Sequence, residues 1–99
     1  MGKLTKSYQE HLGERLQDTI EAAEYLNAAL EDEDGRVFLL ALRDVAGARG
    51  MSNVAESAQL NRENLYRMLS DQGNPTFASM LGLLRALGIE LHVRPHLPQ

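Results

Sequence analysis

The stretch Met51–Ser70 constrains the fold of this chain more than any other part of the sequence. Its apolar residues recur at the i, i+3 and i+4 spacing of two short helices, interrupted by a corner at Gln59-Leu60-Asn61. Ala55 lies ten residues before Leu65, and a small side chain there lets two helices cross closely at a steep angle. The stretch therefore predicts a helix-turn-helix over residues 51–70.

The second helix of this pair carries polar side chains on its outward face. Asn61 can cap that helix, because its short side chain accepts hydrogen bonds from first-turn amides. The outward residues are Arg62, Glu63, Tyr66, Arg67 and Ser70. Arginine suits the reading of a DNA major groove, since it bonds guanine bidentately and phosphate directly. The alternative is a helical hairpin whose polar face is simply solvated.

Length and composition predict one all-α domain spanning residues 1–99. With 43% apolar residues and only five aromatic ones, the core must be built mostly from Leu, Ala, Val and Met, which suits helix packing. The absence of cysteine excludes disulfides and thiolate zinc sites. The longest apolar run, Val37–Leu42, is far too short to span a bilayer, and the N-terminus lacks a signal-peptide pattern. We expect a cytoplasmic protein that does not contact a membrane.

Charge is distributed unevenly along the chain. Residues 1–34 hold three Lys/Arg and nine Asp/Glu, a net charge of −6, whereas residues 35–99 hold seven Arg and five Asp/Glu, a net charge of +2. This asymmetry suggests two surfaces with different partners. The alternative is that the acidic N-terminal helices only keep the protein soluble.

Five to six helices are expected in all, with residues 1–7 forming a frayed basic tail. Acidic helices over residues 8–34 come first, one over 8–16 and one from Asp18 or Thr19 to about Leu30. The acidic run of residues 31–34 is unfavourable at a helix C-terminus and favourable at the next N-terminus. A third helix should therefore start near Asp34 and, being apolar almost all round, be the most buried. After a loop over residues 71–75, Thr76 should cap a last helix that ends at Gly88.

Residues 89–94 alternate apolar and polar side chains and predict a short C-terminal β-strand. Nothing else in the chain alternates, so the strand needs a partner from another molecule. We expect two copies to pair as a homodimer that buries Ile89, Leu91 and Val93. Pairing with a strand of another protein is one alternative, and a disordered tail ending in Pro95 and Pro98 is another.

An enzyme is not expected. The chain has no cysteine nucleophile, and its three histidines, His11, His92 and His96, lie near the termini. His92 and His96 are four residues apart, but the segment predicts a strand followed by proline, so they do not share a helix face. The acids of residues 31–34 fit a solvated turn, and no Gly-rich phosphate loop exists. The sequence thus predicts no cofactor and no metal site.

Several stretches resemble a known family when taken together. They are Tyr25–Leu30, Phe38 with Ala41–Val45, Arg62–Ser70, Gly73–Phe77 and Leu84–Gly88. Residues 51–88 resemble the lambda-repressor-like helix-turn-helix. The chain from about Leu16 to Arg94 resembles the addiction-module antidote proteins, which are HigA-like antitoxins of bacterial toxin–antitoxin pairs.

The resemblance implies a five-helix DNA-binding fold with an extra N-terminal helix, and repression of its own operon through an operator. By analogy, Arg62, Glu63 and Arg67 match base-contacting positions, while Ser52 and Asn53 match positions that hold phosphate. The full set of candidate DNA-binding residues is Ser52, Asn53, Asn61, Arg62, Glu63, Asn64, Tyr66 and Arg67. One departure is Gln59, which stands where the family usually has glycine and must adopt a positive φ, or the turn differs.

The resemblance also implies a small RelE/ParE-like toxin partner, usually encoded next door and commonly an RNase. We expect the acidic N-terminal region to dock a basic toxin surface, because such pairing speeds association. The candidate toxin-binding residues are Glu21, Glu24, Glu31, Asp32, Glu33 and Asp34. The alternatives are a helix-turn-helix regulator without a toxin, or a protein-interaction domain that binds no DNA.

Overall fold

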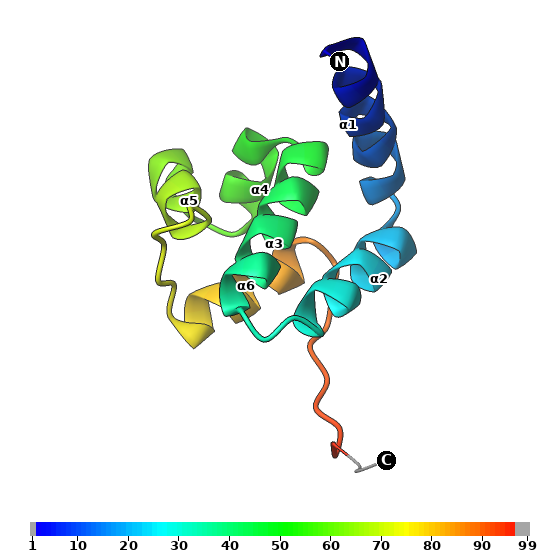
Figure 1. Ribbon diagram of the computed structural model, residues 1–99. Coiled ribbons are helices and arrows are strands. Elements are labelled where there is room, and N and C mark those ends of the chain that lie inside the picture. The colour runs from blue at the N-terminus through cyan, green and yellow to red at the C-terminus, as the bar shows by residue number, and fades with distance from the viewer. Residues whose placement is uncertain (1, 97–99) are drawn as a thin grey trace.

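The computed structural model describes residues 2–96, with side chains from Tyr8 onward. Over this range the chain forms six α-helices (Figure 1). They are α1 (Gly2–Leu16), α2 (Thr19–Leu30), α3 (Gly35–Arg49), α4 (Met51–Ser57), α5 (Arg62–Met68) and α6 (Phe77–Ala86). The all-α prediction is confirmed for these residues. None of these helices is both long and apolar enough to cross a membrane.

The helix starts follow from local capping chemistry. The side chains of Asp18, Asp34 and Thr76 each accept at least one hydrogen bond from a first-turn amide of α2, α3 and α6, respectively. The predicted cap at Thr76 and the predicted start of a helix near Asp34 are confirmed, and Asp18, rather than Thr19, caps α2. Gly88, with φ of 79°, follows α6 in the left-handed conformation that favours glycine. The expected frayed tail is wrong for residues 2–7, which are helical. Residues 3–7 contain neither proline nor glycine, so nothing in them interrupts the helix.

Helix α3 forms the centre of the core, as its all-round apolar sequence predicts. Figure 1 shows it between α1 and α2 on one side and α4 and α5 on the other. Its buried residues are Phe38, Leu39, Ala41, Leu42, Val45 and Ala46. Leu16 of α1, Leu26 of α2, Leu65 of α5 and Leu84 of α6 are among the buried residues that complete the same cluster.

Arg49, at the end of α3, ties three parts of the chain together. Its Nε donates to the Leu16 carbonyl at 3.2 Å, its Nη1 to the Leu87 carbonyl at 3.3 Å, and its Nη2 to Thr19 Oγ1 at 3.3 Å. Carbonyls at helix C-termini carry partial negative charge, which suits a guanidinium. One of the seven arginines after residue 34 is therefore structural.

Several apolar residues that recur at helical spacing on α2 and α6 lie outside the core. Ile20 of α2 is 73% exposed, and Phe77 of α6 is 66% exposed. Helix α6 instead buries Leu83 and Leu84. Phe77 is the first residue of α6 and lies about 10 Å along the helix axis from the buried Leu84. The first turn of the helix therefore extends outside the core.

The predicted C-terminal β-strand over residues 89–94 is wrong. Residues 2–96 contain no strand, and the chain after Gly88 runs on without regular structure. Ile89 belongs to the core, with its amide donating to the Leu84 carbonyl at 2.9 Å. Beyond it the tail leaves the body of the molecule (Figure 1). A strand needs a neighbour that shares its backbone hydrogen bonds, and an all-helical chain supplies none.

Candidate nucleic-acid interface

Helices α4 and α5 are joined by a tight four-residue corner. Ala55 and Leu65, predicted to face each other, are both buried, with 3% and 0% of their surface exposed. The amide of Leu60 donates to the Ala55 carbonyl at 2.8 Å, which closes the corner onto the end of α4. Gln59 has φ of 57°, so the positive φ expected at this position is confirmed. The corner keeps this unusual conformation without glycine.

The start of α4 presents two of the candidate DNA-binding residues. Gly50, with φ of 93°, ends α3 and begins α4, so the two helices meet at a single residue. Ser52 and Asn53 occupy the first turn of α4, and both are exposed. Phosphate contacts commonly come from such polar side chains and from amides at helix starts.

The outer face of α5 presents the remaining candidates. Asn61 accepts from the Glu63 amide at 2.7 Å and so caps the helix, as predicted. The guanidinium carbon of Arg62 lies 5.5 Å from the centre of the Tyr66 ring, within the range of a cation–π contact. Arg67 Nη1 lies 3.5 Å from Asn64 Oδ1. Both arginines are exposed and are held only by long contacts, which are easily exchanged for a ligand.

The loop after α5 packs against the end of that helix. Ser70 Oγ donates to the Arg67 carbonyl at 2.8 Å, and the Gly73 amide donates to the Ser70 carbonyl at 2.9 Å. A Cβ atom on Gly73 would lie 2.3 Å from the Met68 carbonyl oxygen. Only glycine lets the chain pass this close to α5. Sequence analysis identified the loop but not this requirement.

The six candidate toxin-binding carboxylates fall into two groups. Glu21 and Glu24 lie in the first half of α2, whereas residues 31–34 lie beyond its C-terminus. Glu31 is about 10–15 Å further along the helix axis than the first two. Asp34 caps α3, and the Arg36 amide and guanidinium hold the pKa of its carboxyl below the ordinary value. Glu21 forms an ion pair with Arg15 at 3.1 Å. Two of the six carboxylates, Asp34 and Glu21, therefore make contacts within the fold.

Tyr25 and Asp44 form a pair that sequence analysis missed. The Tyr25 hydroxyl donates to Asp44 Oδ2 at 2.6 Å and links α2 to α3. Burial, and then the hydrogen bond to Asp44, raise the pKa of Tyr25 to about 12. The two residues are 19 positions apart, and no local pattern marks such a contact.

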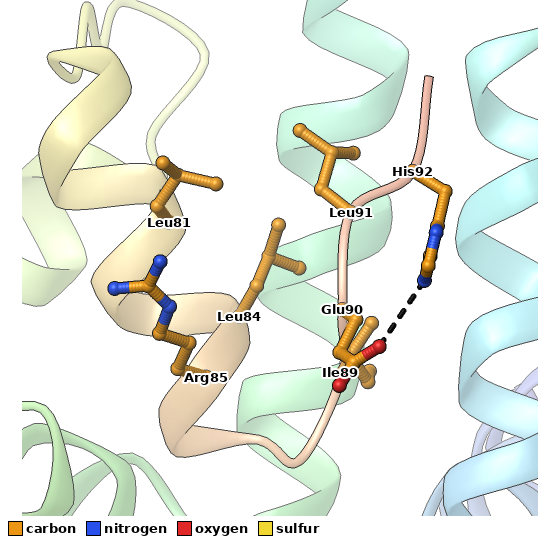
Figure 2. Close-up of a pocket in the computed structure, with 7 residues that line it drawn as sticks. All are labelled: Leu81, Leu84, Arg85, Ile89, Glu90, Leu91 and His92. Atoms are coloured by element: carbon orange, nitrogen blue, oxygen red, sulfur yellow. Dashed lines mark hydrogen bonds and ion pairs between the residues drawn. The ribbon is translucent and has the colours of Figure 1, made fainter. Parts of the chain in front are cut away.

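A cleft of about 260 Å³ lies between α6 and the C-terminal tail (Figure 2). Leu81, Leu84, Ile89 and Leu91 supply its apolar lining, and Arg85, Glu90 and His92 its polar lining. Of the three predicted dimer residues, Ile89 is 9% exposed, Leu91 40% and Val93 95%. The three do not form one common face, because Ile89 is part of the core.

No group of three or more potential metal ligands occurs among the residues that the structure describes. His92 Nε2 lies 3.1 Å from Glu90 Oε2 on the exposed tail (Figure 2). That contact is fully on the surface, since both side chains are at least 80% exposed.

Comparison with known proteins identifies the family. A family model described as probable addiction module antidote protein matches residues 6–95. The chain belongs to this antidote family. The resemblance drawn from the sequence is thereby confirmed.

One relative of this chain is a protein of Haemophilus influenzae strain Rd that is described as uncharacterized. It is 40% identical over 83 residues, which cover 84% of this chain and 86% of the relative. No solved structure matches the chain. Membership in an antidote family implies a cognate toxin and a role that is typically not enzymatic.

Proposed function

We propose that this antidote is a DNA-binding antitoxin with a lambda-repressor-like helix-turn-helix formed by α4 and α5. It neutralises a small RelE/ParE-like toxin and represses its own operon. The observation that carries the DNA-binding part is the exposed pair Arg62 and Arg67 on α5. Ala55 of α4 and Leu65 of α5 are both buried, so the two helices pack through these faces while both arginines stay exposed.

The dimensions of α5 suit a major groove. An α-helix with its side chains is about 10–12 Å across, and the groove is about 12 Å wide. Arg62 and Arg67 would reach base edges, with Glu63 and Asn64 beside them. Tyr66 would brace Arg62 through the contact already present between them. Ser52 and Asn53 would contact the phosphate backbone, and Asn61 would hold the start of α5.

The test is operator binding by arginine variants. Arg62→Ala should cost about 1–3 kcal/mol of binding free energy if the side chain reads a base. Arg67→Ala should weaken binding as well. Affinity is measured by gel shift at fixed salt on the promoter DNA of the protein's own operon. Arg15→Ala is the matched control, because Arg15 is on α1, across α3 from α5 (Figure 1).

If both arginine variants bind the operator with unchanged affinity, α5 is not the helix that contacts the bases. No shift at all with the wild-type protein would favour a protein-interaction domain without DNA binding. DNA binding by a protein that has no toxin partner would favour a simple transcriptional regulator.

We further propose that the antidote acts as a homodimer. A helix-turn-helix protein reads two half-sites about 34–36 Å apart through two-fold symmetry. The apolar side chains available for such a contact are Leu91 and Val93 of the tail and Phe77 of α6, all exposed in this chain. Phe77 lies one helical turn before Leu81, which lines the cleft beside the tail.

A further inference from the structure

An apolar groove runs between α2 and α3, away from the candidate DNA-binding helix. Its volume is about 340 Å³. The residues lining it are Tyr25, Ala28, Ala29, Val37, Leu40, Ala41 and Asp44. Leu40 is 45% exposed, although the adjacent Leu39 and Ala41 are buried. The most buried helix of the molecule thus presents one large apolar side chain outward at this groove.

Asp44 provides a fixed negative charge among these apolar residues. The Tyr25 hydroxyl donates to one of its carboxylate oxygens at 2.6 Å and thereby orients the group. Asp44 is nevertheless exposed, and a carboxylate can accept further hydrogen bonds. A Lys or Arg side chain from outside could therefore pair with an acid that is already positioned.

The charges around the groove are mainly negative on its α2 side. Glu24 lies one turn before Ala28, and Glu21, which pairs with Arg15, lies one turn before Tyr25. Glu31, Asp32 and Glu33 follow the other end of α2 and are all exposed. On the α3 side, Arg36 pairs with Asp34 at 3.4 Å, which offsets its charge, and Arg43 is exposed. The acids found from the sequence thus flank an apolar groove at both ends.

We propose that the α2–α3 groove is the docking site for the cognate toxin, which places a basic and apolar segment in it. An apolar side chain of the toxin packs on Leu40, and a Lys or Arg pairs with Asp44 and Glu24. This proposal rests on the proposed antitoxin function and adds the location of the contact. Nucleic acid is disfavoured here by charge, and a second copy would set one acidic α2 against another.

The test compares full-length variants with the purified product of the adjacent gene as the binding probe. Leu40→Ser and Asp44→Asn should each weaken the affinity measured by calorimetry by about tenfold or more. Asp44→Asn should also reduce the salt dependence of binding. Substitutions are preferred to deletion, because removing α1 and α2 would strip Leu16, Ala22 and Leu26 from the core.

Ile20→Ser is the matched control. Ile20 is 73% exposed on α2 but does not line the groove, so its loss should leave affinity unchanged. Thermal melting of each variant, followed by circular dichroism, reports whether the fold is intact, and operator binding should not change in any of them.

The outcomes separate the two proposals. Wild-type binding that is lost on changing Leu40 or Asp44 supports the groove as the docking site. Wild-type binding that both variants retain overturns the groove but leaves the antitoxin function in place. Failure of the wild-type protein to bind the adjacent gene's product overturns both.

Discussion

Gly73 is the residue at which the loop after α5 approaches that helix most closely. An added Cβ would lie 2.3 Å from the Met68 carbonyl oxygen and 2.8 Å from that of Arg67. Because both atoms belong to the backbone, a flexible side chain cannot relieve the clash. We expect Gly73→Ala to lower the free energy of unfolding by about 1–3 kcal/mol, as measured by urea denaturation.

Gly47→Ala is the control for this change. Gly47 is exposed within α3, and an added Cβ would meet nothing within 4 Å. Alanine in a helix interior is favoured over glycine by about 0.5–1 kcal/mol, so this variant should be more stable than the wild-type protein. Equal stability of the Gly73→Ala variant and the wild type would contradict the proposed contact.

Tyr25 makes the free energy of unfolding depend on pH in the alkaline range. Its pKa is raised to about 12 in the folded chain, against an ordinary value of about 10. The fold therefore favours the neutral phenol. This contribution is fully present below the unfolded pKa and is lost as pH rises from 10 to 12. Tyr25→Phe should flatten the fall in unfolding free energy across this window, measured by urea denaturation at pH 9 and pH 11. An identical fall in both proteins would show that Tyr25 is not its source.

At the scale of elements, the sequence was enough to predict where helices begin. It was only partly enough to predict which side chains of a helix are buried. Asp34, Asn61 and Thr76 cap their helices through contacts within three residues, so local sequence suffices. Which apolar side chains become buried depends on the position of neighbouring helices. Ile20 and Phe77 fit an apolar stripe but lie where no other helix covers them.

The same distinction applies to the candidate sites. Arg67 could be placed on the outer face of α5, because it follows the buried Leu65 by two residues and so points away from it. Arg62 lies three residues before Leu65 and is exposed at the first position of α5. The pairing of Tyr25 with Asp44 and the three bonds of Arg49 join residues 19 to 38 positions apart. Such contacts depend on how helices pack, and no spacing rule in one sequence gives them.

At the scale of the whole molecule, the uneven charge of the sequence becomes a separation in space. Helices α1 and α2 lie on one side of α3 and α5 lies on the other (Figure 1). The proposed toxin groove and the proposed DNA-reading face are therefore on different elements. If both proposals hold, this arrangement lets the protein bind DNA and a toxin at the same time.

The proposed reading of a two-fold operator calls for a dimer, and we propose that the exposed apolar residues Phe77, Leu91 and Val93 form its contact. The molecule measures 43 × 34 × 26 Å, so the half-site spacing of about 34–36 Å is on the scale of one copy. Leu91, Val93 and Phe77 would lose their exposed apolar surface in such a contact, which is favourable by about 25 cal/mol per Å². Ile89 is excluded because it already belongs to the core.

We expect the wild-type protein to be a dimer at tens of micromolar and a Leu91→Ser/Val93→Ser variant to be largely monomeric, by sedimentation velocity. A chain ending at Glu90 should also be largely monomeric, because it lacks Leu91 and Val93. It should still fold, because it keeps Ile89, whose amide donates to the Leu84 carbonyl. Ile20→Ser, which changes an exposed apolar residue on α2, should remain a dimer. If all of these proteins are dimers, the contact lies on another face. If all are monomers, binding to the operator must itself bring the two copies together, and the occupancy of the two half-sites should then rise cooperatively with protein concentration.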